Sequence, residues 1–171
     1  MGINMESNYK EKLKMIMGKY PKLRECIKNN DWETFWSGLM STEPTTLLSD
    51  TRLQWNPFWA CLFMTAFAQS GIDCQLKEIP SFFASNPETA RELTEIVIPE
   101  GVTTIRQSAF EDCDNLSQIS IPKSIQQIGI DAFLRSEGVN YRRYITIPEA
   151  YNDPDVLAQI GIEDTDSVTF I

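Results

Sequence analysis

The stretch LTEIVIPEGVTTIRQSAFEDCDN, residues 93–115, is followed at once by LSQISIPKSIQQIGIDAF, residues 116–133. The second stretch repeats the residue types of the first with a step of 23 positions. The matching pairs are Leu93/Leu116, Ile96/Ile119, Ile98/Ile121, Pro99/Pro122, Val102/Ile125, Ile105/Ile128, Ala109/Ala132 and Phe110/Phe133. A fixed period of about 20–50 residues indicates stacked copies of one structural unit. Each copy buries its apolar side against its neighbours, so the copies are expected to share one core.

The pattern continues with two irregularities toward the C-terminus. Steps of 26 and then 23 residues lead from Ile119 and Ile121 to further apolar pairs, first Ile145 and Ile147 and then Val168 and Phe170. The three additional residues fall in 135–141, which predicts a bulged loop there. A step of 26 from Ala132 predicts its equivalent at Ala158, where Gln159 replaces the following Phe. Residues 93–171 are therefore expected to form about three repeats and a terminal strand.

Each repeat is expected to place one short strand about 4.8 Å from the next, in a small parallel sheet. Because side chains alternate between the two faces of a strand, the neighbours of the buried isoleucines point outward. The predicted partner-binding face consists of Glu95, Val97, Gln118, Ser120, Tyr144, Thr146 and Thr169. Ser167 and the prolines Pro99, Pro122 and Pro148 are expected on the same side. The alternative is that these are solvated strand residues that bind nothing.

A second candidate site is the acidic loop Glu111, Asp112 and Asp114. Clustered carboxylates attract a basic partner or a cation. The spacing does not match that of an EF-hand, so a solvated acidic turn is favoured over a calcium site. No metal site and no cofactor are predicted.

Residues 1–92 have a helical pattern and are interpreted as a separate helical domain. Apolar spacing and capping residues predict helices over 9–20, from Pro21 through Ile27, over 32–39 after an Asp31 N-cap, and from Asn56-Pro57 to Gly71. A connection over 41–50 is expected, with a helical turn at Thr45–Leu48. The predicted fold class is α+β, in which this helical domain caps a short C-terminal solenoid.

All four tryptophans, Trp32, Trp36, Trp55 and Trp59, lie in the helical part. Such a cluster is either the core of a small bundle or an aromatic binding platform. The chain has no histidine, which excludes Ser-His and Cys-His nucleophile pairs, His-ligated metals and His proton shuttles. An enzyme would need carboxylates such as Asp31, Glu33, Glu43 and Asp50, or a thiol such as Cys61.

The charge is unevenly distributed. The chain of 171 residues has a formal net charge of -9, and residues 93–171 hold 13 acidic and 5 basic side chains. Such a surface repels phosphate, so nucleic acid and anionic membranes are poor partners. Residues 1–30 instead hold seven Lys and Arg, interpreted as a solvated helix face or as a contact to an anionic surface. The start of the chain lacks the apolar region of a secretory signal, and Phe58–Ala68 is too short to span a bilayer. A cytoplasmic protein with reduced cysteines is expected.

The pattern L-x-x-I-x-I-P-x-x-V-x-x-I-x-x-x-A-F-x-x-C in residues 93–133 resembles the BspA-like leucine-rich repeat of bacterial surface and phage-associated proteins. The resemblance implies parallel strands on a concave face, irregular or 3₁₀ segments on the convex face, and a protein-binding role. It covers residues 93–171, and residues 1–92 resemble no family.

The leading functional hypothesis is a non-enzymatic cytosolic module that binds a protein through its acidic repeat face. The alternatives are a phage-type effector that blocks a host protein by acidic mimicry of nucleic acid, acting then in the host cytoplasm, and a structural subunit of a larger assembly. A homodimer through the terminal strand, Val168–Ile171, is a further possibility because an uncovered sheet edge can pair with a second copy.

Overall fold

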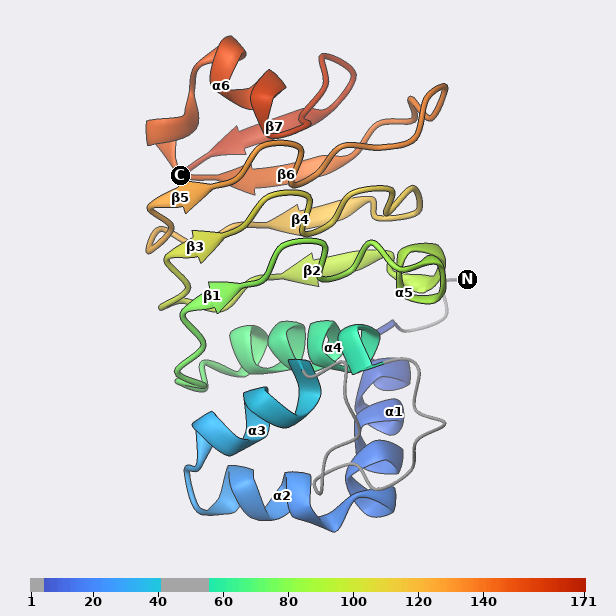
Figure 1. Cartoon of the computed structure of the whole chain (residues 1–171), viewed down its shortest axis with the longest axis vertical. Helices are drawn as coiled ribbons and strands as arrows, with labels where there is room; N and C mark the ends of the chain where they lie inside the picture. Colours follow the sequence, from blue (N-terminus) through green and yellow to red (C-terminus); the bar gives the residue numbers. More distant parts are fainter. Residues whose placement is uncertain (1–4, 41–55) are drawn as a thin grey trace.

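A computed structural model of the chain describes residues 5–40 and 56–171 (Figure 1). The first helices of the chain occupy one end of the molecule, and the other end holds short parallel strands with a few short helices between them, which confirms the predicted mixture of helices and parallel sheet. The helices of the first part are α1 (Met5–Lys19), α2 (Pro21–Lys28), α3 (Trp32–Met40) and α4 (Asn56–Ser70). The predicted turn at Thr45–Leu48, together with Glu43, Asp50 and Trp55, lies outside the described residues.

The ends of the helices follow from the capping residues. The Thr34 N–H donates to Asp31 Oδ1 at 3.3 Å, so Asp31 caps α3 as predicted. Helix α4 ends just before Gly71, whose φ of +67° lets the Ile72 N–H return to the Phe67 carbonyl at 3.0 Å.

Aromatic rings form the centre of the helical part. Phe35 is fully buried and meets Trp36 and Phe63 edge to face, with ring centroids 4.8 and 5.1 Å apart. Trp32 packs in the same way on Phe67 at 5.2 Å. Because Trp32 and Trp36 are buried, they belong to the core and not to a binding platform.

The repeat part contains two parallel sheets. One has the strand order β2-β4-β6-β7 and the other β1-β3-β5. Their bounds are β2 (Glu95–Val97), β4 (Gln118–Ser120), β6 (Tyr144–Ile147), β7 (Ser167–Phe170), β1 (Glu78–Ile79), β3 (Thr104–Ile105) and β5 (Gln127–Ile128). Short helices connect some of them: α5 (Pro87–Glu92), the 3₁₀ helix η1 (Glu149–Tyr151) and α6 (Pro154–Gln159).

The strand register follows the sequence steps of 23 and 26 residues. Ile96 pairs with Ile119, Ile119 with Ile145, and Ile145 with Val168. The predicted terminal strand is therefore present as β7. Equivalent residues form stacks in the core, where the Phe110 and Phe133 rings lie parallel with centroids 5.4 Å apart.

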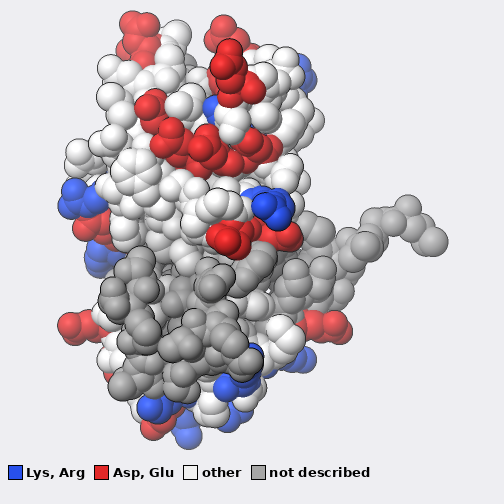
Figure 2. Space-filling model, turned by 45° about the vertical axis from the view of Figure 1, so that its right-hand side comes forward, with Lys and Arg blue, Asp and Glu red and all other residues white. Residues whose placement is uncertain are grey.

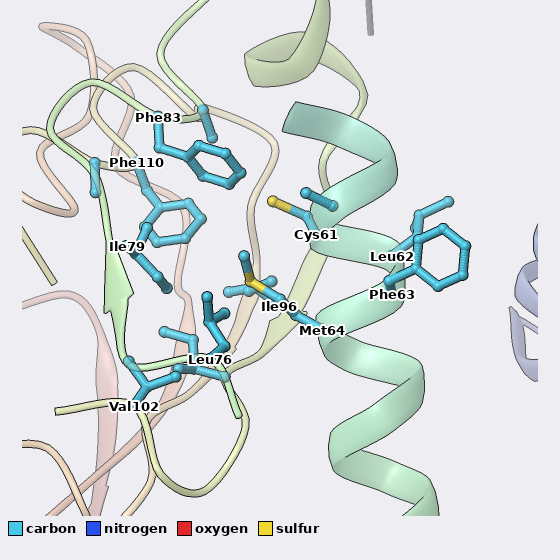
Figure 3. Close-up of a cluster of buried hydrophobic side chains, with 14 of the residues drawn as sticks. Cys61, Leu62, Phe63, Met64, Leu76, Ile79, Phe83, Ile96, Val102 and Phe110 are labelled. Carbon is cyan, nitrogen blue, oxygen red and sulfur yellow. The ribbon is translucent and has the colours of Figure 1, made fainter. Parts of the chain in front are cut away.

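Helix α4 contacts the first strand of the larger sheet. The Thr65 hydroxyl accepts the Val97 N–H at 3.0 Å. Met64 and Cys61 point from α4 toward Ile79 and Phe110 of the repeat part, whereas Phe63 lies on the opposite side of the helix (Figure 3). The two parts of the chain therefore share one continuous apolar core.

Four details differ from the sequence predictions. Only one sheet was predicted, and β1 lies before Leu93, where the sequence interpretation began the repeat. The signal was a 26-residue step, since Leu76 and Ile79 precede Val102 and Ile105 by that interval. It was missed because the Ala-Phe pair is absent from this first copy, which has Phe83-Ala84 instead.

The prolines Pro99, Pro122 and Pro148 are buried and do not lie on the outer face. All three lie beyond the last residue of their strands, so strand alternation no longer sets their direction. Ala158 is exposed at the end of α6, and Ile160 takes the buried position instead, where its carbonyl accepts the Phe133 N–H at 2.9 Å. The helical turn of α6 shifts the spacing there by two residues.

Candidate functional site

The outer face of the larger sheet contains a shallow hollow of about 190 Å³. Residues from all four strands line it, and every side chain of the predicted partner-binding face is among them: Glu95, Val97, Gln118, Ser120, Tyr144, Thr146 and Thr169. The buried Ile96, Ile119 and Ile145 form the floor of this sheet face. We call this surface the sheet face.

The side chains of the sheet face form two rows across the strands. The register places Val97, Ser120, Thr146 and Thr169 in one row and Glu95, Gln118, Tyr144 and Ser167 in the other. Hydroxyl and amide groups predominate, and Glu95 is the only charged residue in either row. Tyr144 is the most prominent, with 59% of its surface exposed. The sheet face therefore offers hydrogen-bonding groups and one aromatic ring, but little charge.

The acidic loop lies elsewhere, because none of its residues lines the hollow. Asp114 Oδ1 accepts the Ser136 N–H at 2.9 Å, and Asp112 Oδ1 accepts the Ser136 hydroxyl at 3.3 Å. The hydrogen bonds of these two carboxylates thus connect one repeat to the next. In the described part of the chain, no group of three or more Cys, Asp or Glu side chains is arranged to hold a metal ion.

Exposed acidic side chains of the repeat part gather in a band in the space-filling view (Figure 2). The predicted acidity of the repeat half and the predicted sheet face are therefore separate surfaces, because the sheet face contributes only Glu95.

Sequence reasoning missed a buried ionic cluster that joins the last two repeats. Arg143 donates to both carboxylate oxygens of Asp166, at 3.0 and 2.7 Å, and to the carbonyls of Phe133 and Gly161 at 2.7 and 2.9 Å. Arg135 donates to Glu163 at 2.8 Å. The repeat that holds the 135–141 insertion differs from its neighbours in having two buried arginines, Arg135 within the insertion and Arg143 just after it.

Hydrogen bonding controls the protonation of this cluster. Burial alone would raise the pKa of Asp166, but the hydrogen bonds from Arg143 and from the Glu163 N–H, with the charges of Arg143 and Arg135, hold the pKa below its usual value. Asp166 therefore remains ionised and paired.

The helical part presents no assembled catalytic group among its described residues. All four cysteines are unpaired and buried. Burial raises the pKa of the Cys61 thiol far above its usual value, and burial with the nearby Asp114 and Asp112 carboxylates raises that of Cys113 to about 12. Such thiols are poor nucleophiles. Asp31 is the α3 cap, and Glu33 is exposed to solvent on α3.

The basic stretch is solvated where its side chains are described, since Lys14, Lys19, Lys22, Arg24 and Lys28 are all exposed. No described helix is both long enough and apolar enough to cross a membrane.

Comparison with known proteins identifies the repeat. Residues 72–153 match the model of the BspA-type leucine-rich repeat region, in six copies. No curated protein matches the chain. A leucine-rich repeat protein of known structure from Bacteroides ovatus ATCC 8483 is similar with 24% identity and a TM-score of 0.37, over 48% of this chain and 20% of that one. The chain thus spans about a fifth of that protein's length. Since the match starts at residue 72 and includes the paired strands β1 to β6, residues 72–153 of this chain belong to the BspA-type leucine-rich repeat family.

Proposed function

We propose that this protein is a non-enzymatic interaction module whose repeat part forms a short solenoid and binds a protein partner through the sheet face. The observation that carries the proposal is the alignment of seven outward side chains from four strands along one hollow. Leucine-rich repeats generally mediate protein interactions, which supports the same reading. The mixture of hydroxyl groups with Tyr144 suits a polar protein surface, because tyrosine often anchors interfaces.

The helical part is proposed to cap the solenoid. A stack of repeats exposes the core of its first copy unless another element covers it. The packing of α4 on β2, with the Thr65 hydroxyl on the Val97 N–H, supports this role. We place the start of the repeat domain at residue 72, before the 92/93 boundary that sequence spacing suggests, because β1 pairs with β3. We place the protein in the cytoplasm.

The sheet face is tested with two glutamines that lie on strands of different sheets. Gln118 of β4 lines the hollow, whereas Gln127 of β5 is also exposed but lies outside it. Once crosslinking with mass spectrometry in the native cell has identified a partner, Gln118→Arg and Tyr144→Ala are each expected to weaken its binding at least tenfold. A loss of about 1.4 kcal/mol of binding free energy corresponds to that factor.

Gln127→Arg is the matched control and is expected to leave the affinity unchanged, with equal urea midpoints for all variants. Equal binding by Gln118→Arg, Tyr144→Ala and Gln127→Arg would exclude the sheet face as the binding surface.

A second candidate function is favoured by the acidic band of Figure 2. In this case the protein blocks a basic host protein by presenting carboxylates where nucleic acid would bind, as a phage-type effector would. Attraction between exposed charges is screened over about 10 Å at 0.1 M salt. Binding to the identified partner is therefore expected to weaken at least tenfold between 50 and 300 mM NaCl. An affinity that does not change with salt would rule out the mimicry. Recovery of the protein in purified virus particles would instead indicate a structural subunit.

A further inference from the structure

Glu95 is the only charged residue among the described residues that line the hollow of the sheet face. It is half-buried at the start of β2, and within residues 5–40 and 56–171 no Lys or Arg side chain pairs with it. A carboxylate that is partly removed from water is stabilised by a nearby cation. Glu95 therefore presents an uncompensated negative charge in the hollow.

The strand register places an amide and an aromatic ring beside this carboxylate. Glu95 pairs with Gln118, and Gln118 with Tyr144, on the parallel strands β2, β4 and β6. Neighbouring strands lie about 4.8 Å apart, so the backbones of Glu95 and Tyr144 are separated by about 10 Å. All three side chains line the hollow, and those of Gln118 and Tyr144 are exposed. The row therefore presents a carboxylate, an amide and an aromatic ring in that order.

A guanidinium group fits this row in shape and charge. It is planar, and it can donate two N–H groups to one carboxylate while its face lies on an aromatic ring. The first contact needs about 2.8 Å and the second up to about 6 Å from the ring centre, which together approach the separation of Glu95 and Tyr144. The amide oxygen of Gln118, between them, can accept a further N–H. The ammonium group of lysine is a compact point charge and lacks this planar shape.

An arginine of this chain already makes the same arrangement elsewhere. The guanidinium carbon of Arg135 lies 4.9 Å from the centre of the Tyr141 ring, and Arg135 Nη2 donates to Glu163 Oε2 at 2.8 Å. One guanidinium group thus contacts a tyrosine ring and a carboxylate together. Glu95 and Tyr144 offer these two groups on the sheet face, where no arginine of the described chain lies between them.

The charge of the repeat part favours a cation over a neutral ligand. Residues 93–171 hold 13 acidic and 5 basic side chains, so their summed field attracts positive charge. A sugar ring could also stack on Tyr144, but it would leave the charge of Glu95 uncompensated. A basic side chain of a protein partner satisfies both the ring and the carboxylate.

We infer that the protein partner places an arginine side chain on the sheet face, between Glu95 and Tyr144. Its guanidinium group donates to the Glu95 carboxylate and to the Gln118 amide oxygen, and it lies over the Tyr144 ring. This inference rests on the proposed function, because it names what the sheet face recognises in its partner.

The test uses the isotope-labelled full chain and the peptide acetyl-GSRSG-amide, titrated to 10 mM while amide NMR spectra are recorded. The arginine peptide is expected to shift the N–H signals of Glu95, Gln118 and Tyr144. A citrulline peptide, which keeps the planar shape without the charge, is expected to bind at least fivefold more weakly, and a lysine peptide at least threefold. These comparisons leave the protein unchanged, so they do not depend on the folding of any variant.

Two protein variants assign the contacts. Glu95→Gln removes the charge and nearly keeps the shape, and it is expected to weaken binding of the arginine peptide at least fivefold. Tyr144→Leu keeps an apolar side chain without the ring and is expected to weaken binding at least threefold. Glu92→Gln is the matched control, because Glu92 is exposed on α5 and does not line the hollow. It is expected to leave binding unchanged.

The partner found by crosslinking separates this inference from the proposed function. Glu95→Gln is expected to weaken binding of that partner at least fivefold. If Gln118→Arg weakens the partner and Glu95→Gln does not, the sheet face still binds the partner and only the arginine contact is wrong. If neither variant weakens the partner, both proposals are wrong.

The peptide experiment can overturn the inference in three ways. One is the absence of shifts in the sheet-face N–H signals with the arginine peptide. Another is binding of the citrulline or lysine peptide as tight as that of the arginine peptide. The third is that the oligosaccharide maltotriose shifts these signals more strongly than the arginine peptide, since a glycan would then be the better occupant of the hollow.

Discussion

Replacing Arg143 by methionine is expected to lower the free energy of unfolding by about 3–5 kcal/mol, because it leaves a buried carboxylate without its partner. The side chain of Asp166 is fully buried, and Arg143 supplies the two shortest contacts that Asp166 makes with another side chain. The same change frees the carbonyls of Phe133 and Gly161. Circular dichroism during urea unfolding measures the loss for the whole chain, and amide exchange in β6 and β7 locates it.

Arg142→Met is the matched control, because the adjacent Arg142 is exposed and is expected to change stability by less than about 0.5 kcal/mol. Adding Asp166→Leu to Arg143→Met is expected to restore part of the loss, since an apolar pair needs no charge partner. If the single Arg143 and Arg142 variants unfold at the same urea concentration, the buried cluster does not stabilise the last repeat.

The cluster also predicts a pH dependence with a definite sign. The pKa of Asp166 is lower in the folded protein than in the unfolded chain, so the unfolded state binds more protons at low pH. The contribution of Asp166 is complete above its unfolded pKa of about 3.9 and is lost as the pH falls through the folded value. Urea midpoints between pH 6 and 3 are therefore expected to fall more steeply for the natural protein than for Asp166→Asn.

Replacing Phe110 by alanine is expected to cost about 3–5 kcal/mol of stability. Its side chain is almost completely buried and stacks on Phe133, at the point where two repeats meet. Figure 3 places it beside Ile79 and Phe83, which belong to the preceding repeat, and opposite α4. A cavity at this position removes the contacts of Phe110 with both neighbouring repeats at once. The paired strands hold the backbone in place, so the surrounding residues cannot move together to fill the cavity.

Phe82→Ala is the matched control, because Phe82 is 54% exposed although it lies next to the buried Phe83. It is expected to change the urea midpoint little. Tryptophan fluorescence reports the helical part, where Trp32 and Trp36 are buried, and circular dichroism reports the whole chain. Coincident transitions of the Phe110→Ala protein by both methods are expected from the shared core, and separate transitions would contradict it.

The parts of the fold that the sequence predicted depend on local patterns. The 23-residue step fixed the register of Ile96, Ile119 and Ile145, because identical positions in stacked repeats must superpose. Asp31 and Gly71 marked helix ends because capping uses only the nearest backbone groups. The seven residues of the sheet face followed from the alternation of a strand whose buried side was already known.

Features that depend on interactions between distant residues escaped prediction. Strand β1 was missed because its pairing with β3 spans 26 residues and its first copy lacks the Ala-Phe pair. The Arg143–Asp166 pair was missed because two charged residues 23 positions apart carry no local signal of burial.

The sequence by itself determined the repeat, the strand alternation and the family, since each depends on a periodic pattern of residues. Residues that recur at the same position of each repeat contact one another when the repeats stack. Only the tertiary structure decided that Arg143 is buried, that the acidic band lies apart from the sheet face, and that α4 covers the β2 edge of the larger sheet. The physical reason is that burial, surface charge and edge protection depend on which distant segments pack together. The sequence of one segment does not show which other segment will contact it.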